Sequence, residues 1–152
     1  MRRRGFILML AGAAQAMLPG CAQPRDPRGL VDIKWGRDSC AHCGMVLSDF
    51  RFAAQAIGLQ PREHWVFDDV GCAAAWLDSR PAAEQAALRL WVAPVDSKSE
   101  AVAWLDARDA RFREARGSPM GYDFGAMATL QPGSLAFEAL RERVRARRMC
   151  RT

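Results

Sequence analysis

The first twenty residues constrain this chain most, because we expect them to be removed from the mature protein. Arginines at positions 2–4 precede an apolar stretch from Phe6 to Met17, and residues 1–20 contain no acidic side chain. A basic start, a short apolar core and small residues before a cleavage point are typical of a secretory signal peptide. The apolar stretch is shorter than the roughly 18–20 residues of a membrane-spanning helix. The sequence therefore predicts a signal peptide over residues 1–20 and excludes a polytopic membrane protein.

The predicted signal peptide ends in Leu-Pro-Gly-Cys at residues 18–21, which resembles the bacterial lipobox. That resemblance implies cleavage before Cys21, thioether lipidation of its sulfur and acylation of its new amine. Several acyl chains anchor a protein stably to a membrane, whereas a single chain does not. Residues 21–31 are then a lipid-anchored tether that faces the periplasm. Because Ala22 rather than an aspartate follows Cys21, the general lipoprotein sorting rule favours the outer over the inner membrane.

Charge is distributed unevenly along the chain. The 152 residues have a formal net charge of +5, but residues 21–140 contain 13 bases and 16 acids. Much of the positive charge lies in residues 141–152, which we assign to the arginine-rich end of a last helix and a tail. A mildly acidic body does not fit a nucleic-acid-binding protein. The length fits one folded domain, which we place at residues 32–140.

The densest group of metal-binding side chains is the sequence Cys-Ala-His-Cys-Gly-Met at residues 40–45. A Cys-x-x-Cys turn can direct two sulfurs at one soft metal ion. Zinc prefers four ligands, and the sequence has no second Cys or His pair of matching spacing. Copper(I) accepts fewer ligands and favours thiolate and thioether sulfur. Met45, close to Cys40 and Cys43, therefore favours a copper(I) site.

Two alternatives stay open at this point. A Cys-x-x-Cys pair also serves thiol–disulfide oxidoreductases, where it follows a strand and opens a helix; the residues after Cys43 are instead β-prone. The other alternative is a copper-binding lipoprotein that stores or senses copper without transferring it. We do not expect an enzyme, because two histidines and no serine motif leave little for a catalytic triad. Cys72 is expected to be an inert thiol in a buried helix, and Cys150 in the tail has no assigned role.

Hydrophobic patterns predict a mixed α and β chain. We expect strands at 52–57, 64–67 and 90–95, helices at 70–78 and 82–88, and a last helix after Ser134. The segment 101–115 is helical by composition, but residues 110–113 fit an edge strand equally well. A weak internal repeat places a turn with adjacent glycine and methionine, Gly-Met at 44–45 and Met-Gly at 120–121, before an Asp-Phe pair in each half of the chain. This repeat places Met45 and Met120 at matching turns, where the two side chains could share one ion.

Taken together, these segments resemble the NosL family of copper-binding lipoproteins. The resemblance also rests on Ala-Gln-Ala at 54–56, Phe-Asp-Asp at 67–69, Trp-Leu-Asp-Ala at 104–107 and Pro-Met-Gly at 119–121. It implies an α+β fold of two small ββαβ-like halves packed together, with Cys43, Met45 and Met120 at the copper site.

The same resemblance implies delivery of copper(I) for maturation of nitrous oxide reductase, with a copper-supplying membrane transporter complex as a second partner. Two features depart from the family pattern. The second half shows no clear final strand after Asp123, and the arginine-rich tail has no counterpart. His42 occupies a variable position, so the resemblance assigns it no role.

Overall fold

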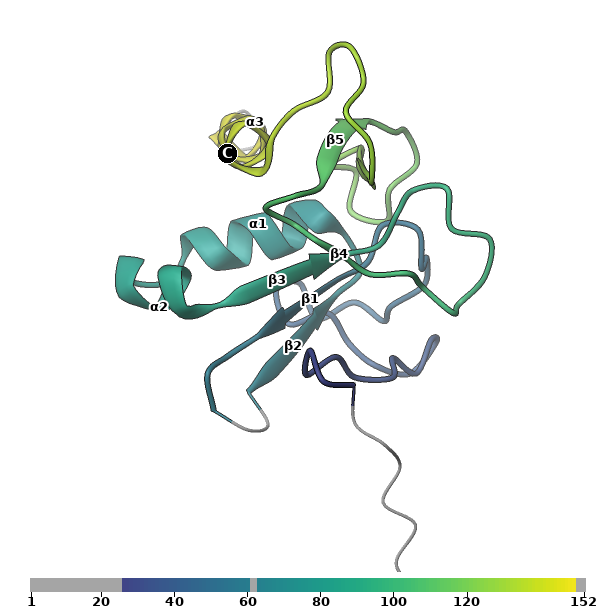
Figure 1. Cartoon of the computed structure of the whole chain (residues 1–152), viewed down its shortest axis with the longest axis vertical. Helices are drawn as coiled ribbons and strands as arrows, with labels where there is room; N and C mark the ends of the chain where they lie inside the picture. The colour runs from purple at the N-terminus through teal and green to yellow at the C-terminus, as the bar shows by residue number, and fades with distance from the viewer. Residues whose placement is uncertain (1–25, 61–62, 150–152) are drawn as a thin grey trace, which may run out of the picture.

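The computed structural model describes residues 26–60 and 63–149 of the chain. The predicted signal peptide, the predicted lipidation site Cys21 and the tail residue Cys150 lie outside these residues. The part described contains antiparallel sheets and helices, which confirms the predicted α+β class (Figure 1). Among these residues, no helix has both the length and the apolar character needed to cross a membrane.

A four-stranded antiparallel sheet carries the first half of the fold. Its strands are β1 (Ala54–Ile57), β2 (His64–Phe67), β3 (Arg89–Val92) and β4 (Leu105–Asp106), in the order β2-β1-β3-β4. Every residue of the inner strand β1 is buried. Side chains alternate between the faces of a strand, so Ala54 and Ala56 share one face and Gln55 lies on the other. The Gln55 side chain bonds both backbone groups of Val31, at 3.0 and 3.2 Å, and so holds the N-terminal segment against the sheet.

Helix α1 (Val70–Asp78) packs on β1 and β2, and the short helix α2 (Ala82–Ala87) follows it. Asp69 caps the start of α1, and small residues let the helix approach the sheet closely. The ring of Trp76 in α1 lies 4.9 Å from that of Trp65 and 5.2 Å from that of Phe67. The first half therefore runs β1-β2-α1-α2-β3, which is the ββαβ order with one short helix added.

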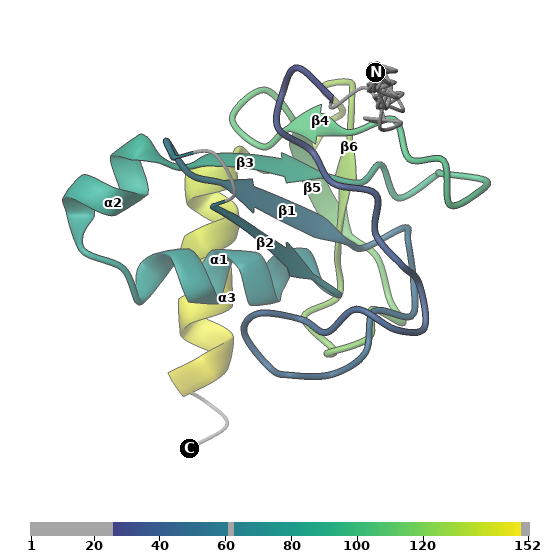
Figure 2. The ribbon, with the colours of Figure 1, turned by 90° about the horizontal axis from the view of Figure 1, so that it is seen from below.

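The second half consists of strands β5 (Arg111–Glu114) and β6 (Phe124–Met127), which form a two-stranded sheet, and helix α3 (Phe137–Met149). Helix α3 packs across α1 (Figure 2). The order is ββα, because α3 extends to the last described residue and no strand follows it there. The halves are also joined by a parallel bridge between Pro94 and Ala126. The ββαβ expectation thus holds for the first half, while the second half lacks the final strand among the described residues.

The segment 101–115 contains β4, a turn and β5 rather than a helix. Backbone bonds of 3.1 and 2.9 Å from Asp109 and Ala110 to the Asp106 carbonyl close the turn. Phe112 then pairs with the backbone of Leu135 and buries its side chain. The edge-strand interpretation of residues 110–113 is therefore correct. Strand pairing of β4 with β3 and of β5 with β6 decides the structure of this segment, although its composition favours a helix.

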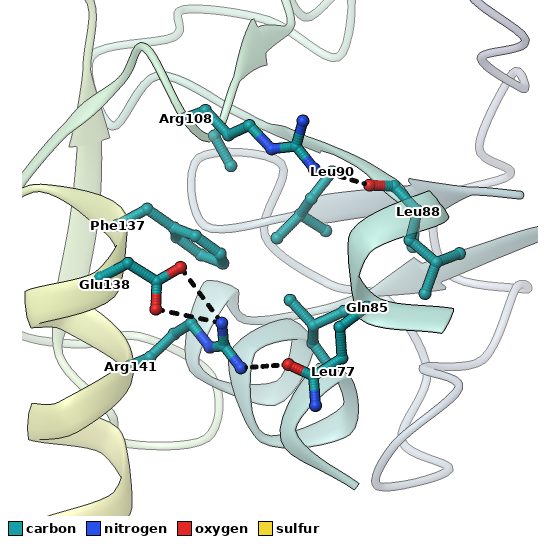
Figure 3. Close-up of a pocket in the computed structure, with 10 residues that line it drawn as sticks. Leu77, Gln85, Leu88, Leu90, Arg108, Phe137, Glu138 and Arg141 are labelled. Atoms are coloured by element: carbon teal, nitrogen blue, oxygen red, sulfur yellow. Dashed lines mark hydrogen bonds and ion pairs between the residues drawn. The ribbon is translucent and has the colours of Figure 1, made fainter. Parts of the chain in front are cut away.

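A cavity of about 60 Å³ lies between α1, α2 and α3. The guanidinium of Arg141 lies at this cavity, where it donates to Gln85 at 2.6 Å and to both oxygens of Glu138 at 3.1 Å (Figure 3). It also pairs with Asp78 at the end of α1. The side chains of Arg141, Gln85 and Glu138 therefore hydrogen-bond to one another at the cavity. None of the predicted metal ligands lines it.

Candidate metal centre

The Cys-x-x-Cys motif lies in a closed turn. Residues 39–46 form a loop whose two ends pair as an antiparallel bridge. The Cys40 N–H donates to the Met45 carbonyl at 2.8 Å, and the Gly44 N–H donates to the Cys40 carbonyl at 2.9 Å. Gly44 has a φ of 75°, a left-handed conformation that glycine adopts without strain. The motif does not open a helix, in contrast to the arrangement expected of a thioredoxin-like oxidoreductase.

Two contacts hold this loop where β2 ends and α1 begins. The Ala41 N–H donates to the Val66 carbonyl at 2.9 Å, which it can reach because β2 is an edge strand. The carboxylate of Asp68, which is 2% exposed, accepts the Ser48 N–H at 2.7 Å. The loop and the residues just after it are therefore held against the end of β2 and the segment that leads into α1.

This placement brings a third cysteine to the motif. Cys72, in the first turn of α1, is fully buried, Cys40 is 3% exposed and Cys43 is half-buried. The Sγ atoms of Cys40, Cys43 and Cys72 all lie within 4.8 Å of one another. Sequence reasoning expected Cys72 to be buried and inert, and it missed this contact. The aspartate pair before α1 signals only that Cys72 lies in the first turn of the helix; no local pattern signals that the 39–46 loop lies against that turn.

The thiols of the cluster differ in acidity. The Cys72 thiol donates to the Cys40 sulfur, and this bond lowers the pKa of Cys40 more than any other contact. Backbone N–H groups of Cys43, Asp68 and His42 lower it further. Burial works in the opposite direction, but the pKa of Cys40 stays well below its usual range. The pKa of Cys72 is raised, first because its S–H is hydrogen-bonded to the Cys40 sulfur and second because the thiol is buried. Burial also raises the pKa of Cys43. Cys40 is thus the first to become a thiolate, and a bound cation would displace the remaining thiol protons.

The second predicted turn, which presents Met120, is attached to the same end of α1. The Asp69 carboxylate accepts the Gly71 N–H at 2.8 Å through Oδ1. Through Oδ2 it accepts the Ser118 hydroxyl at 2.6 Å and the Met120 N–H at 3.2 Å. Burial raises the pKa of Asp69, although these bonds favour its ionised form. The two loops that carry the predicted methionines therefore converge on one helix terminus.

The four predicted metal ligands differ in position and in exposure. Cys40 and Cys43 lie together, joined by the unexpected Cys72. Met120 is half-buried, packs against the core and is tied to α1 through its backbone. The Met45 side chain is 58% exposed, while its backbone N–H points at the Cys43 sulfur. The cysteines thus form a cluster, and the methionines lie on the two loops beside it.

The donor set is suited to a soft metal ion. Three sulfurs around one ion at metal–sulfur distances of about 2.3 Å would lie about 4.0 Å apart, which the observed cluster can accommodate with little movement. Thiolate sulfur selects copper(I) and zinc among the common metals, and structural zinc sites close with four ligands. A set of three cysteines leaves such a zinc site one ligand short and fits copper(I) better.

The fold is similar to that of a solved structure, the crystal structure of the copper chaperone NosL from Shewanella denitrificans. The two chains superpose with a TM-score of 0.52 and share 16% sequence identity. The match covers 70% of this chain and 81% of the other. Neither a protein-family model nor a curated protein matches the chain in sequence. The similarity to NosL inferred from short motifs is therefore confirmed in the fold.

Proposed function

We propose that this chain, which has a NosL-like fold, binds copper(I) and delivers it for maturation of nitrous oxide reductase. The observation that carries the proposal is the cluster of three Sγ atoms within 4.8 Å of one another. The same cluster lies in a fold that is similar to a copper chaperone. Copper is the cargo of such a protein, so the chain acts as a carrier and not as an enzyme.

The thiolates of Cys40, Cys43 and Cys72 supply the charge that holds copper(I), and the thioethers of Met45 and Met120 are further ligands that take turns at one remaining position, because copper(I) does not bind all five sulfurs at once. Thioethers are neutral and bind copper(I) without losing a proton. They bind more weakly than thiolates, which suits a site that must later release its ion. Met45 is the most exposed of these five side chains, so it is the ligand that a partner reaches first.

The remaining assignments rest on the sequence. Acylated Cys21 anchors the mature protein, residues 21–31 are the tether and residues 32–140 form the copper-binding domain, with the helix end and tail at 141–152. The protein faces the periplasm from the outer rather than the inner membrane. Its partners are nitrous oxide reductase and a copper-supplying membrane transporter complex.

A competition titration of the reduced protein with copper(I) and zinc tests the first step of this function. We expect one copper(I) to bind much more tightly than zinc. The substitutions Cys40→Ser and Cys43→Ser should each weaken copper(I) binding. Oxidation of the cysteines should abolish binding, because the thiolate is the ligand form. Preference for zinc would contradict the proposal.

Transfer of the ion is measured separately. Copper-loaded protein is mixed either with copper-free nitrous oxide reductase or with a chelator whose copper(I) affinity equals that of the reductase. The protein should lose its ion faster to the reductase than to the chelator. Equal rates would favour storage or sensing over delivery. Disulfide exchange by the metal-free protein, unaffected by Met45→Leu and Met120→Leu, would favour an oxidoreductase.

A further inference from the structure

Asp69 makes more contacts than a helix cap requires. Its carboxylate is fully buried. One oxygen, Oδ1, caps α1 by accepting the Gly71 N–H. The other, Oδ2, accepts two groups from a loop far along the chain, the hydroxyl of Ser118 and the N–H of Met120. One carboxylate thus performs two tasks, and the second has no part in forming the helix.

The packing around Asp69 fixes the same loop from a second side. A Cβ on Gly71 would overlap the ring of Tyr122, so only glycine lets this ring lie against the first turn of α1. Arg147 of α3 donates to the Tyr122 carbonyl, and its guanidinium lies 4.4 Å from the centre of the Phe124 ring. Residues 118–122 are therefore held against the turn of α1 that contains Cys72.

The neighbouring Asp68 holds the other loop in the same way. Its carboxylate accepts the Ser48 N–H at 2.7 Å, just beyond the loop that carries Cys40 and Cys43. Two adjacent buried carboxylates thus attach two loops, each with a methionine, to one helix terminus. Each loop is bonded through a backbone N–H, that of Ser48 or Met120, and the Ser118 hydroxyl adds a side-chain bond, so the carboxylates set the position of the loops.

We propose that Asp69 is a positioning residue of the copper site. Through Oδ2 it holds residues 118–122 so that the Met120 thioether joins the sulfurs of Cys40, Cys43 and Cys72 around one ion. The inference rests on the proposed function, in that the cysteine cluster binds copper(I). It adds a residue that touches no metal and acts through Met120.

The substitution Asp69→Asn separates the two tasks of the carboxylate. An asparagine keeps an oxygen to cap Gly71, and asparagine is among the best N-cap residues. Its amide NH₂ would replace Oδ2 and face two donors, Ser118 and Met120, so the loop is released. We expect copper(I) affinity to fall about 10–100-fold, as for other residues that orient a metal ligand.

A double-mutant cycle distinguishes positioning from loss of stability. If Asp69 acts through Met120, the double variant Asp69→Asn/Met120→Leu binds copper(I) no more weakly than Met120→Leu alone. X-ray absorption should show that Asp69→Asn and Met120→Leu lose the same sulfur scattering. Asp78→Asn, at the other end of α1, is the matched control, because it lowers stability without touching either loop and should leave the affinity unchanged.

A second variant keeps the test decisive if Asp69→Asn folds poorly. Ser118→Ala removes one of the two donors, and its effect on affinity should likewise vanish in the Met120→Leu background. Affinity equal to wild type in Asp69→Asn, or effects that add to that of Met120→Leu, would overturn the positioning role. Failure of the wild-type protein to bind copper(I) would overturn the proposed function itself.

Discussion

At the scale of single residues, Cys72 changes the character of the site from a pair of thiols to a cluster. Its thiol is the largest influence that lowers the pKa of Cys40. We expect Cys72→Ala to raise the pKa of Cys40 and to weaken copper(I) binding. The ultraviolet absorbance of the thiolate, followed against pH, measures the first effect.

Cys72→Ser is the matched control for this change, because a serine hydroxyl still donates to the Cys40 sulfur. The pKa of Cys40 should stay lower in Cys72→Ser than in Cys72→Ala, whereas both variants lose a sulfur ligand. An unchanged Cys40 titration in Cys72→Ala would show that the two side chains do not interact.

The methionines can be tested against a buried methionine that lies on no candidate loop. Met45→Leu and Met120→Leu keep the side-chain volume, so each should cost under about 1.5 kcal/mol of stability. Each should nevertheless weaken copper(I) binding in a competition titration, while Met127→Leu in β6 should not. If Met120→Leu binds copper(I) as wild type does, the two loops do not share the ion.

Part of the site could be predicted from residue spacing alone. Cys40, Cys43 and Met45 lie within one turn, so their proximity follows from local chain geometry. Cys72 and Asp69 could not be assigned in this way, because their roles depend on contacts between α1 and loops distant in sequence. A buried alanine-rich helix with one cysteine looks the same whether or not a second sulfur approaches it.

At the scale of elements, α1 is held at both ends by aspartates. At its C-terminal end Asp78 accepts hydrogen bonds from Arg141 and Arg145 of α3. Burial works to raise the pKa of Asp78, but the bonds from Arg145 and Arg141 outweigh it and hold the pKa below its usual range. The ion pairs therefore join α1 and α3 most strongly when Asp78 is ionised.

We expect Asp78→Asn to lower the free energy of unfolding by about 2 kcal/mol, because it leaves the buried Arg141 guanidinium short of a partner. Since the folded-state pKa lies below the unfolded value, the stabilisation is complete above that unfolded value and is lost as pH falls through the folded pKa. Denaturant unfolding at pH 7 and near pH 3 should show the difference from wild type shrinking in acid. Glu84→Gln, in an exposed pair with Arg80 at 3.9 Å, should change stability little.

The elements themselves were predictable where the local pattern was strong. The strands β1 and β2 and the helix α1 follow from short apolar runs, turn residues and the Asp69 cap. The segment 101–115 was ambiguous because its composition favours a helix, whereas strand pairing with distant partners decides its structure. Local propensity is a weak guide wherever such pairing is available.

At the scale of the whole molecule, the sequence predicts a folded domain attached to a membrane by acylated Cys21 alone. Cys21→Ser should abolish incorporation of a labelled fatty acid, because the side chain loses the sulfur that forms the thioether. Copper(I) affinity should stay as in wild type, since the lipidated sulfur of Cys21 is not available as a ligand. Cys150→Ser serves as the control and should keep the label; a Cys21→Ser variant that is still labelled would disprove the lipobox interpretation.

The bonds between Gln55 and Val31 have a mechanical consequence for an anchored protein. Gln55 is fully buried on the inner strand β1, and it grips the backbone of the chain just after the tether, at 3.0 and 3.2 Å. The cysteine loop follows only a few residues later in the sequence. In a protein anchored through Cys21, as the sequence predicts, a pull from the membrane would reach the sheet at Val31 before it reached that loop. The bonds to Gln55 would then carry the load, so that the cysteine cluster keeps its shape while the anchor moves.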